Sequence, residues 1–187
     1  MNLSQSRSAS SAAGITLAGE SDQFPKTIPS LNLRTILVPT DFSENSRKAL
    51  ICAVRIAQRN DSNLILFHVF ELAESVRQLP QDLFYKINEE LAKLRDDVTR
   101  RSEEKLVALS RGVQESNVKT ETRQRLGTPY EEIVKVAWER SADLIVMATH
   151  GYTGLKHFLL GSTTERVVRV SPCPVLVVRQ EERDFVS

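Results

Sequence analysis

Five short apolar runs alternate with stretches of helical periodicity, and this alternation constrains the fold more than any other feature of the 187-residue chain. Strands that alternate with helices predict an α/β fold, doubly wound around a mainly parallel five-stranded sheet. The run that ends at Ala148 is continuously apolar, as expected of a central strand covered on both faces. The run that ends at Gln124 alternates, which favours a half-exposed edge strand. The predicted strands are 35–39, 63–69, 118–124, 143–148 and 175–178.

The segments between these runs carry signals for helices. Ser43 predicts the N-cap of a helix that reaches about Arg59. Capping boxes at 128–131 and 162–165 predict two further helix starts, the first with a proline at its first helical position. Apolar residues at spacings of four, three and four predict a long helix that reaches toward Leu109. These residues are Ile87, Leu91, Leu94 and Val98.

The predicted helices and strands occupy only part of the chain. Residues 1–33 are rich in Ser, Ala and Gly and lack periodicity, which predicts a flexible N-terminal extension. We expect one folded domain over 34–180 and a short charged tail over 181–187. The length supports one domain with a substantial core rather than two.

Composition excludes several classes of protein. Lys and Arg total 25 against 24 Asp and Glu, and this balance argues against nucleic-acid binding. No apolar run approaches the roughly 18 residues that span a membrane. The N-terminus is Ser-rich and poor in acidic residues, but it lacks the pattern of a secretory signal. Cys52 and Cys173 form no CxxC pair. We therefore expect a protein of the reducing cytoplasm.

Parallel sheets bind ligands beyond the carboxyl ends of their strands, close to the point where the strand order reverses. In this sequence those ends are 39–41, Val69 and 148–151. A loop with two glycines then leads to Gly161-Ser162 at a helix start, where free N–H groups form an anion site. The segment matches neither a Walker loop nor GxGxxG. The alternative is that the glycines only turn the chain and Ser162 only caps a helix.

Taken together, four motifs resemble those of the universal stress protein family. They are Ile36–Asp41 with Phe42-Ser43, His68-Val69, Ala148–Gly151 through Gly161-Ser162, and Pro172–Val178. The resemblance covers 34–179 with the motifs in the right order. It implies a Rossmann-like fold of the adenine nucleotide alpha hydrolase-like kind. It also implies a homodimer in which the final strands, Val175–Val178, meet antiparallel.

The ATP-binding branch of that family carries Gly, two residues, Gly, nine residues, then Gly followed by Ser or Thr. Gly151 and Gly161-Ser162 match the later elements, whereas Ala148 replaces the first glycine. The resemblance implies ATP as cofactor, with Mg²⁺ that arrives with the nucleotide. The implied site comprises Pro39, Thr40, Asp41, Val69, Met147, Ala148, Thr149, His150, Gly151, Gly161, Ser162, Thr163 and Thr164.

The resemblance also assigns roles within this site. Asp41 accepts hydrogen bonds from ribose hydroxyls or the adenine amine, and Val69 packs on the adenine. Gly151 and residues 161–164 hold the phosphates. The alternatives are that Asp41 only caps the turn at Ser43 and that Val69 belongs to the ordinary core. The Ala148 methyl group is expected to crowd the ribose and to weaken binding.

The function that follows is an ATP-binding regulator or switch in stress response, with an unknown downstream protein partner. The alternative is a nucleotide-independent dimeric scaffold, which Ala148 favours. An enzyme acting on adenine nucleotides ranks lower, because no residue is an evident general base or arginine finger. His68 is expected to be an interior histidine. The three scattered histidines do not suggest a zinc site, so no metal ligand is assigned.

Overall fold

The computed structural model describes residues 32–71, 81–149 and 160–179, with side chains of the long helix described from Ala92 onward. The chain divides into two units, Met1–Asn32 and Leu33–Ser187, each with contacts mainly within itself. The helices and strands described below belong to the second unit. The strands are β1 (Thr35–Pro39), β2 (Asn63–Phe70), β3 (Thr120–Leu126), β4 (Leu144–Ala148) and β5 (Val175–Val178). The helices are α1 (Glu44–Asn60), α3 (Gln81–Gln114), α4 (Pro129–Glu139) and α5 (Ser162–Val170).

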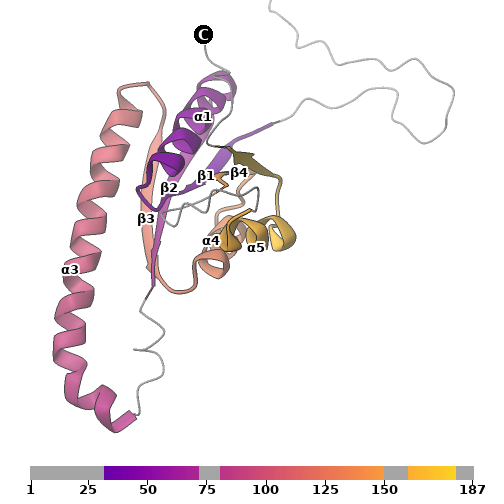
Figure 1. Cartoon of the computed structure of the whole chain (residues 1–187). Helices are drawn as coiled ribbons and strands as arrows, with labels where there is room; N and C mark the ends of the chain where they lie inside the picture. The colour runs from indigo at the N-terminus through magenta and orange to yellow at the C-terminus, as the bar shows by residue number, and fades with distance from the viewer. Residues whose placement is uncertain (1–31, 72–80, 150–159, 180–187) are drawn as a thin grey trace, which may run out of the picture. The chain divides into compact units, whose positions relative to one another are not determined.

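The strands form one sheet in the order β3-β2-β1-β4-β5, and every neighbouring pair is parallel (Figure 1). The predicted α/β fold is confirmed, with a sheet that is parallel throughout. β3 and β5 lie at the two edges, and the alternating sequence of β3 had favoured an edge position for that strand. The chain moves outward from β1 through β2 to β3 and then crosses back to β4. The strand order therefore reverses between β1 and β4, which is where such sheets bind ligands.

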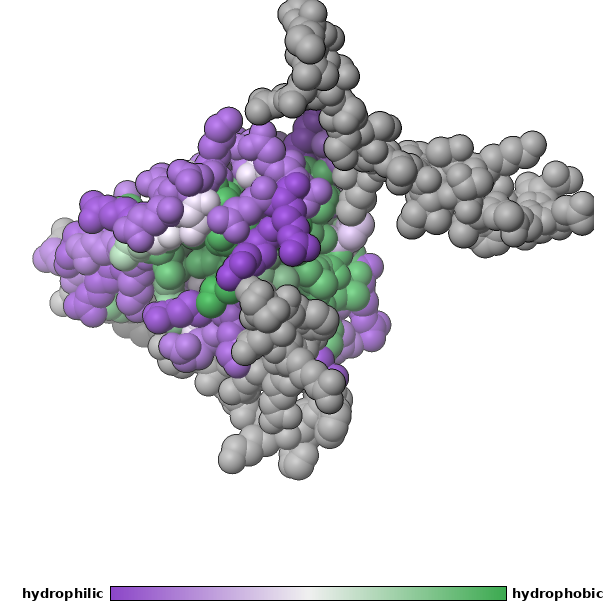
Figure 2. All heavy atoms as spheres, turned by 90° about the horizontal axis from the view of Figure 1, so that it is seen from above, coloured by the Kyte–Doolittle hydropathy of each residue, from purple (hydrophilic) through white to green (hydrophobic). Residues whose placement is uncertain are grey.

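Helices cover both faces of the sheet because successive strand residues point to opposite sides. Ile36 and Val38 of β1 belong to a buried cluster that α1 and α3 complete, whereas Leu37 belongs to a second cluster beneath α4 and α5. All three side chains are fully buried. In the view of Figure 2, hydrophilic side chains cover most of the outside and apolar side chains gather between them.

The apolar periodicity that predicted the long helix extends beyond the part of α3 that packs against the sheet. Leu106 and Val113 of α3 are buried, but Leu94 is 59% and Val98 38% exposed. A helix of 34 residues is about 51 Å long, roughly twice the length of an eight-residue strand. One end of α3 therefore runs past the sheet (Figure 1). Amphipathic spacing located the helix correctly but did not indicate which part of its apolar face is covered.

The helix starts agree only in part with the predicted caps. Ser43 caps α1, and its hydroxyl accepts a hydrogen bond from the Ser46 N–H. Thr128 precedes α4, with Pro129 in the first turn, but its side chain makes no capping bond. The predicted capping box at Ser162 is wrong, because the N-cap of α5 is Gly161. The Gly161 N–H donates to the Thr149 carbonyl, which keeps Gly161 extended and makes Ser162 the first helical residue.

Among the residues that the structure describes, no helix is both long and apolar enough to cross a membrane.

Candidate functional site

A cleft of about 230 Å³ opens at the carboxyl edge of the sheet, at the reversal between β1 and β4. Its walls come from the turn after β1, the end of β2, the first turn of α4, the end of β4 and the start of α5. The lining residues are Pro39, Thr40, Asp41, Ser46, Phe67, Val69, Pro129, Ile133, Met147, Ala148, Gly161, Ser162, Thr163 and Thr164.

One wall is the turn between β1 and α1, which side-chain hydrogen bonds hold in place. The Thr40 N–H continues the sheet by donating to the Phe67 carbonyl at 2.8 Å. Oδ1 of Asp41 accepts from the N–H and the hydroxyl of Ser43, at 3.0 and 2.6 Å. Phe42 adopts φ 65°, a left-handed backbone conformation that residues other than glycine rarely adopt. The Asp41 carboxylate is therefore fixed in the wall by its own turn.

Electrostatics keep this carboxylate charged. Burial raises the pKa of Asp41, but hydrogen bonds, led by those from the side chain and backbone of Ser43, lower it by more, so the pKa lies below its ordinary value. A carboxylate has about four acceptor positions, and the two bonds from Ser43 use part of that capacity. Asp41 caps the turn at Ser43, which was the alternative to a role in binding. Its remaining acceptor positions can still accept a hydrogen bond from a hydroxyl or amine of a ligand.

The opposite wall is the N-terminus of α5, which offers backbone donors. The N–H groups of Ser162, Thr163 and Thr164 precede the first bond of the helix, in which the Glu165 N–H donates to the Gly161 carbonyl. They consequently have no partner within α5. Such groups, together with the helix dipole, attract anions. The Gly161 N-cap makes no side-chain bond that would occupy them.

Two hydrogen bonds hold this N-terminus against the end of β4. The Gly161 N–H donates to the Thr149 carbonyl at 2.8 Å, and the buried Thr164 hydroxyl donates to the Ala148 carbonyl at 2.9 Å. The Thr164 hydroxyl proton is therefore not available to a phosphate, and only the backbone N–H of this residue is. The Ala148 side chain belongs to the buried cluster with Leu144 and Val146.

Apolar side chains line the cleft between these two walls. Phe67 is fully buried, and Val69, two residues further along β2, is half-buried on the same face. Met147 of β4 and Ile133 of α4 belong to the same cluster. Together these side chains form an apolar surface in the cleft, which suits a flat apolar group of a ligand.

Most of the residues that the sequence proposed for the site line this one cleft. Thr149 is buried beside the cleft but does not line it, and His150 and Gly151 lie outside the described residues. The predicted residues that line it are Pro39, Thr40, Asp41, Val69, Met147, Ala148, Gly161, Ser162, Thr163 and Thr164.

Sequence reasoning missed four lining residues, and each had a local signal. Phe67 precedes Val69 by two and so shares its face of the strand. Ser46 lies three residues after the Ser43 N-cap. Pro129 and Ile133 are four apart at the start of α4, which places them on one side of its first turn.

His68 is an interior histidine, as the sequence predicted. Its Nδ1 lies 2.7 Å from the Thr40 carbonyl oxygen, and because a carbonyl only accepts, Nδ1 carries the proton. Burial lowers the pKa of His68, against the opposing effects of the Thr40 bond and the Asp41 charge. The ring is therefore neutral near pH 7. It points away from the face that carries Phe67 and Val69.

Within the described ranges, no three His, Cys, Asp or Glu side chains come together as a candidate metal site. The polar groups of the described lining residues include one carboxylate, hydroxyls and backbone N–H groups. This chemistry suits a nucleotide, whose Mg²⁺ is held mainly by phosphate oxygens and water.

Comparisons with known proteins agree with this geometry. The model of the universal stress protein family matches residues 32–179. The universal stress protein MJ0531 of Methanocaldococcus jannaschii is 36% identical over 151 residues, which are 81% of this chain and 85% of that protein. The solved structure of MJ0577 is 32% identical with a TM-score of 0.69, and covers 81% of this chain and 99% of its own. A universal stress protein whose structure was solved in complex with cAMP is 26% identical, with a TM-score of 0.54. The match covers 79% of this chain and 98% of that protein.

Proposed function

The chain belongs to the universal stress protein family, and we propose that it binds an adenine nucleotide in the cleft and acts as a nucleotide-dependent regulator of stress response in the cytoplasm. The observation that carries the proposal is the pairing of two walls in one cleft. One presents a charged carboxylate acceptor, and the other presents three backbone donors at a helix N-terminus. A nucleotide has the complementary groups, hydroxyls at one end and phosphates at the other.

The proposed orientation follows from this pairing. The ribose and base lie toward Asp41, with the base against Val69, and the phosphates lie against residues 161–164. ATP is the nucleotide that the family resemblance implies, and it supplies its own sites for Mg²⁺. The complex of a similar universal stress protein with cAMP supports a site for adenine nucleotides in this fold.

The competing proposal, a nucleotide-independent scaffold, rested on Ala148 in place of glycine. The Ala148 side chain packs in the cluster beneath α1, and its carbonyl already accepts from Thr164. The first observation places the methyl group against the core, and the second fixes the backbone that lines the cleft. We therefore favour binding over a scaffold without a ligand.

We propose regulation rather than turnover because, among the residues that the structure describes, Asp41 is the one carboxylate that lines the cleft, and it comes from the turn after β1 rather than from the start of α5. A base for attack on a phosphate has to lie at the phosphate end. Steady ATP hydrolysis well above a protein-free control would contradict this part of the proposal.

The proposed function is tested by mass spectrometry of small molecules released from the freshly purified protein. We expect ATP, ADP or AMP at a stoichiometry that approaches one per chain. The matched control is Gly161→Val purified in parallel, in which a branched side chain fills the approach to the α5 donors. Equal amounts of nucleotide from both proteins would contradict a site at α5, and none from either would favour the scaffold.

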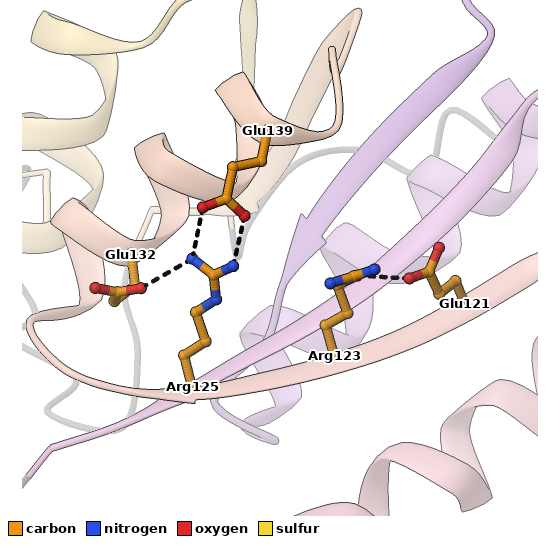
Figure 3. A network of polar contacts seen from close by, with 5 residues as sticks. All are labelled: Glu121, Arg123, Arg125, Glu132 and Glu139. Atoms are coloured by element: carbon orange, nitrogen blue, oxygen red, sulfur yellow. Dashed lines mark hydrogen bonds and ion pairs between the residues drawn. The ribbon is translucent and has the colours of Figure 1, made fainter.

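A second part of the proposal is a homodimer, and it rests on the difference between the two edge strands. On the β3 edge, Arg125 pairs with Glu132 and Glu139 of α4 at 3.2 and 2.5 Å, and Arg123 pairs with Glu121 (Figure 3). Charges of this kind discourage pairing with another sheet. The β5 edge is entirely apolar, and Leu176 is 37% exposed. We propose that the β5 strands of two copies pair.

Light scattering tests the dimer. The wild-type protein should have twice the mass of one chain, and Val177→Lys should have the mass of one, because a buried lysine in a strand pair is costly. The control is Val107→Lys, which places the same charge on α3 at a site that is 37% exposed. A wild-type mass near 21.1 kDa would contradict the dimer.

A further inference from the structure

The turn that carries Asp41 is also held from the face of the sheet that does not line the cleft. His68 lies between Phe67 and Val69, which line the cleft, and its side chain points to the other face. There its ring lies 4.5 Å from the Phe42 ring, centroid to centroid, and its Nδ1 donates to the Thr40 carbonyl. A single side chain of β2 thus contacts the turn on both sides of Asp41.

We propose that His68 is a positioning residue for the ligand. It fixes the Thr40–Phe42 turn and thereby sets where the Asp41 carboxylate stands in the cleft. The role in binding rests on the proposed function, whereas the role in holding the turn is a property of the protein without ligand. His68 does not line the cleft itself, so any effect it has on affinity passes through the Thr40–Phe42 turn that carries Asp41.

The backbone of the turn explains why such support is needed. Phe42 has φ 65°, a conformation that persists only where the surroundings fix it. Thr40 fixes one side, because its Oγ1 accepts the Phe42 N–H at 3.0 Å. Since the Ser46 hydroxyl donates to the Ser43 carbonyl, the Thr40 hydroxyl is the donor to Ser46. These bonds hold the backbone of the turn, while His68 holds the Thr40 carbonyl and the Phe42 ring.

The charges around His68 are consistent with a neutral donor. Asp41 faces it from the turn, and Lys105 faces it from α3, with its Nζ 5.1 Å from the centre of the Phe42 ring. Asp41 favours a proton on the imidazole, whereas Lys105 and burial disfavour a second one. Gln124 of β3 is the register partner of His68 and is uncharged. The ring therefore carries one proton near neutral pH, at Nδ1.

The first test is nitrogen-15 NMR of the imidazole in the ligand-free protein near pH 7. We expect the tautomer with the proton on Nδ1, and protection of the Phe42 amide from hydrogen exchange. His68→Leu should accelerate exchange of that amide about tenfold, because the turn loses a support of the strength of one hydrogen bond. The control Gln124→Leu, on the same face of the next strand, should leave it unchanged. A dominant Nε2 tautomer, or equal exchange in all three proteins, would overturn the proposal.

The second test is a double-mutant cycle on ATP affinity, measured by titration calorimetry. His68→Leu should weaken binding about tenfold in the wild-type background and less than about twofold in the Asp41→Asn background. His68→Asn should restore most of the affinity, because its side-chain N–H is attached at the same distance from Cα as Nδ1. An equal loss in both backgrounds would show that His68 acts on the fold in general, and would overturn the proposal.

The two tests separate this inference from the proposed function. If the wild-type protein binds no nucleotide, the proposed function fails, and the exchange of the Phe42 amide still decides whether His68 holds the turn. If the protein binds ATP but His68→Leu binds it equally well, the proposed function stands and the positioning role fails.

Discussion

The two walls of the cleft are built in opposite ways. The turn after β1 is an irregular segment held by side chains of Thr40, Ser43 and His68, with one residue in a left-handed conformation. The start of α5 is regular backbone without a side-chain cap, fixed to β4 by two hydrogen bonds. The first wall therefore depends on particular side chains, one of which is a titratable histidine. The second depends on the backbone geometry of a helix start, with Gly161 at the N-cap and the Thr164 hydroxyl fixing it to β4.

This difference teaches how the two ends of a ligand are recognised. Backbone N–H groups donate to the oxygens of any phosphate and discriminate little between phosphate-containing ligands. A fixed carboxylate requires a donor at one place and therefore selects the nucleoside. Substitutions in the two walls should consequently have different effects on ATP and on adenosine.

The largest effect is expected from Gly161→Val. The branched side chain fills the approach to the α5 donors, and loss of one or two bonds to charged oxygens corresponds to about 100-fold in affinity for ATP. Gly161 has φ −58°, which valine tolerates, so the fold should persist. Titration with adenosine should give the wild-type affinity, and circular dichroism checks the fold. Equal losses for ATP and adenosine would show that the two walls are not independent.

The second effect is expected from Asp41→Asn, which keeps the size of the side chain but removes its charge. Affinity should fall about tenfold for ATP and adenosine alike, because both contain the ribose and base that this wall contacts. The pKa of Asp41 lies below its ordinary value, so the carboxylate stays ionised. Wild-type affinity for adenosine should therefore stay constant between pH 8 and pH 5. A loss confined to ATP would place the phosphates, rather than the ribose, at Asp41.

A third effect concerns stability, because the turn depends on a titratable group and α5 does not. The pKa of His68 in the folded protein is lowered by burial. The unfolded chain therefore binds the proton first, and stability falls as the pH drops below about 6.5. Urea unfolding at pH 7 and pH 5 should show a larger loss for the wild-type protein than for His68→Asn. An equal loss in the two proteins would mean that His68 already titrates normally in the folded state.

The smallest effect is expected from Ala148→Gly. Its methyl group packs in the core, so removing it should leave ATP affinity within about twofold and lower the free energy of unfolding by about 0.5–1 kcal/mol. Calorimetry and urea unfolding measure the two quantities. A clear gain in affinity would show that the methyl group crowds the ligand after all, as the sequence suggested.

Much of this architecture could be predicted from the sequence. The five strands, the order of elements and the Ser43 cap follow from periodicity and local chemistry, and the carboxyl-edge cleft follows from the parallel sheet. The resemblance to the family brought most of the lining residues together. What local patterns could not give was long-range contact. The left-handed Phe42, the bond of His68 to Thr40 and the shift of the α5 cap to Gly161 depend on segments far apart in the chain.

The direction of the Ala148 side chain was missed for a related reason. The sequence shows that alanine replaces a glycine, but not which face of β4 it occupies. That depends on how β4 sits in the sheet beside β1 and β5. In the folded chain Ala148 both lines the cleft and belongs to the core cluster, and its effect on binding stays a prediction.

The central claim, one cleft that recognises both ends of an adenine nucleotide, is tested most directly by titration calorimetry of nucleotide-stripped protein. ATP with Mg²⁺ should bind once per chain with a micromolar Kd, about 8 kcal/mol, which three or four bonds to charged groups supply after the cost of immobilising the ligand. Adenosine and inorganic triphosphate should each bind more weakly than ATP. No saturable binding of ATP up to millimolar concentration, in both wild-type protein and Ala148→Gly, would contradict the claim.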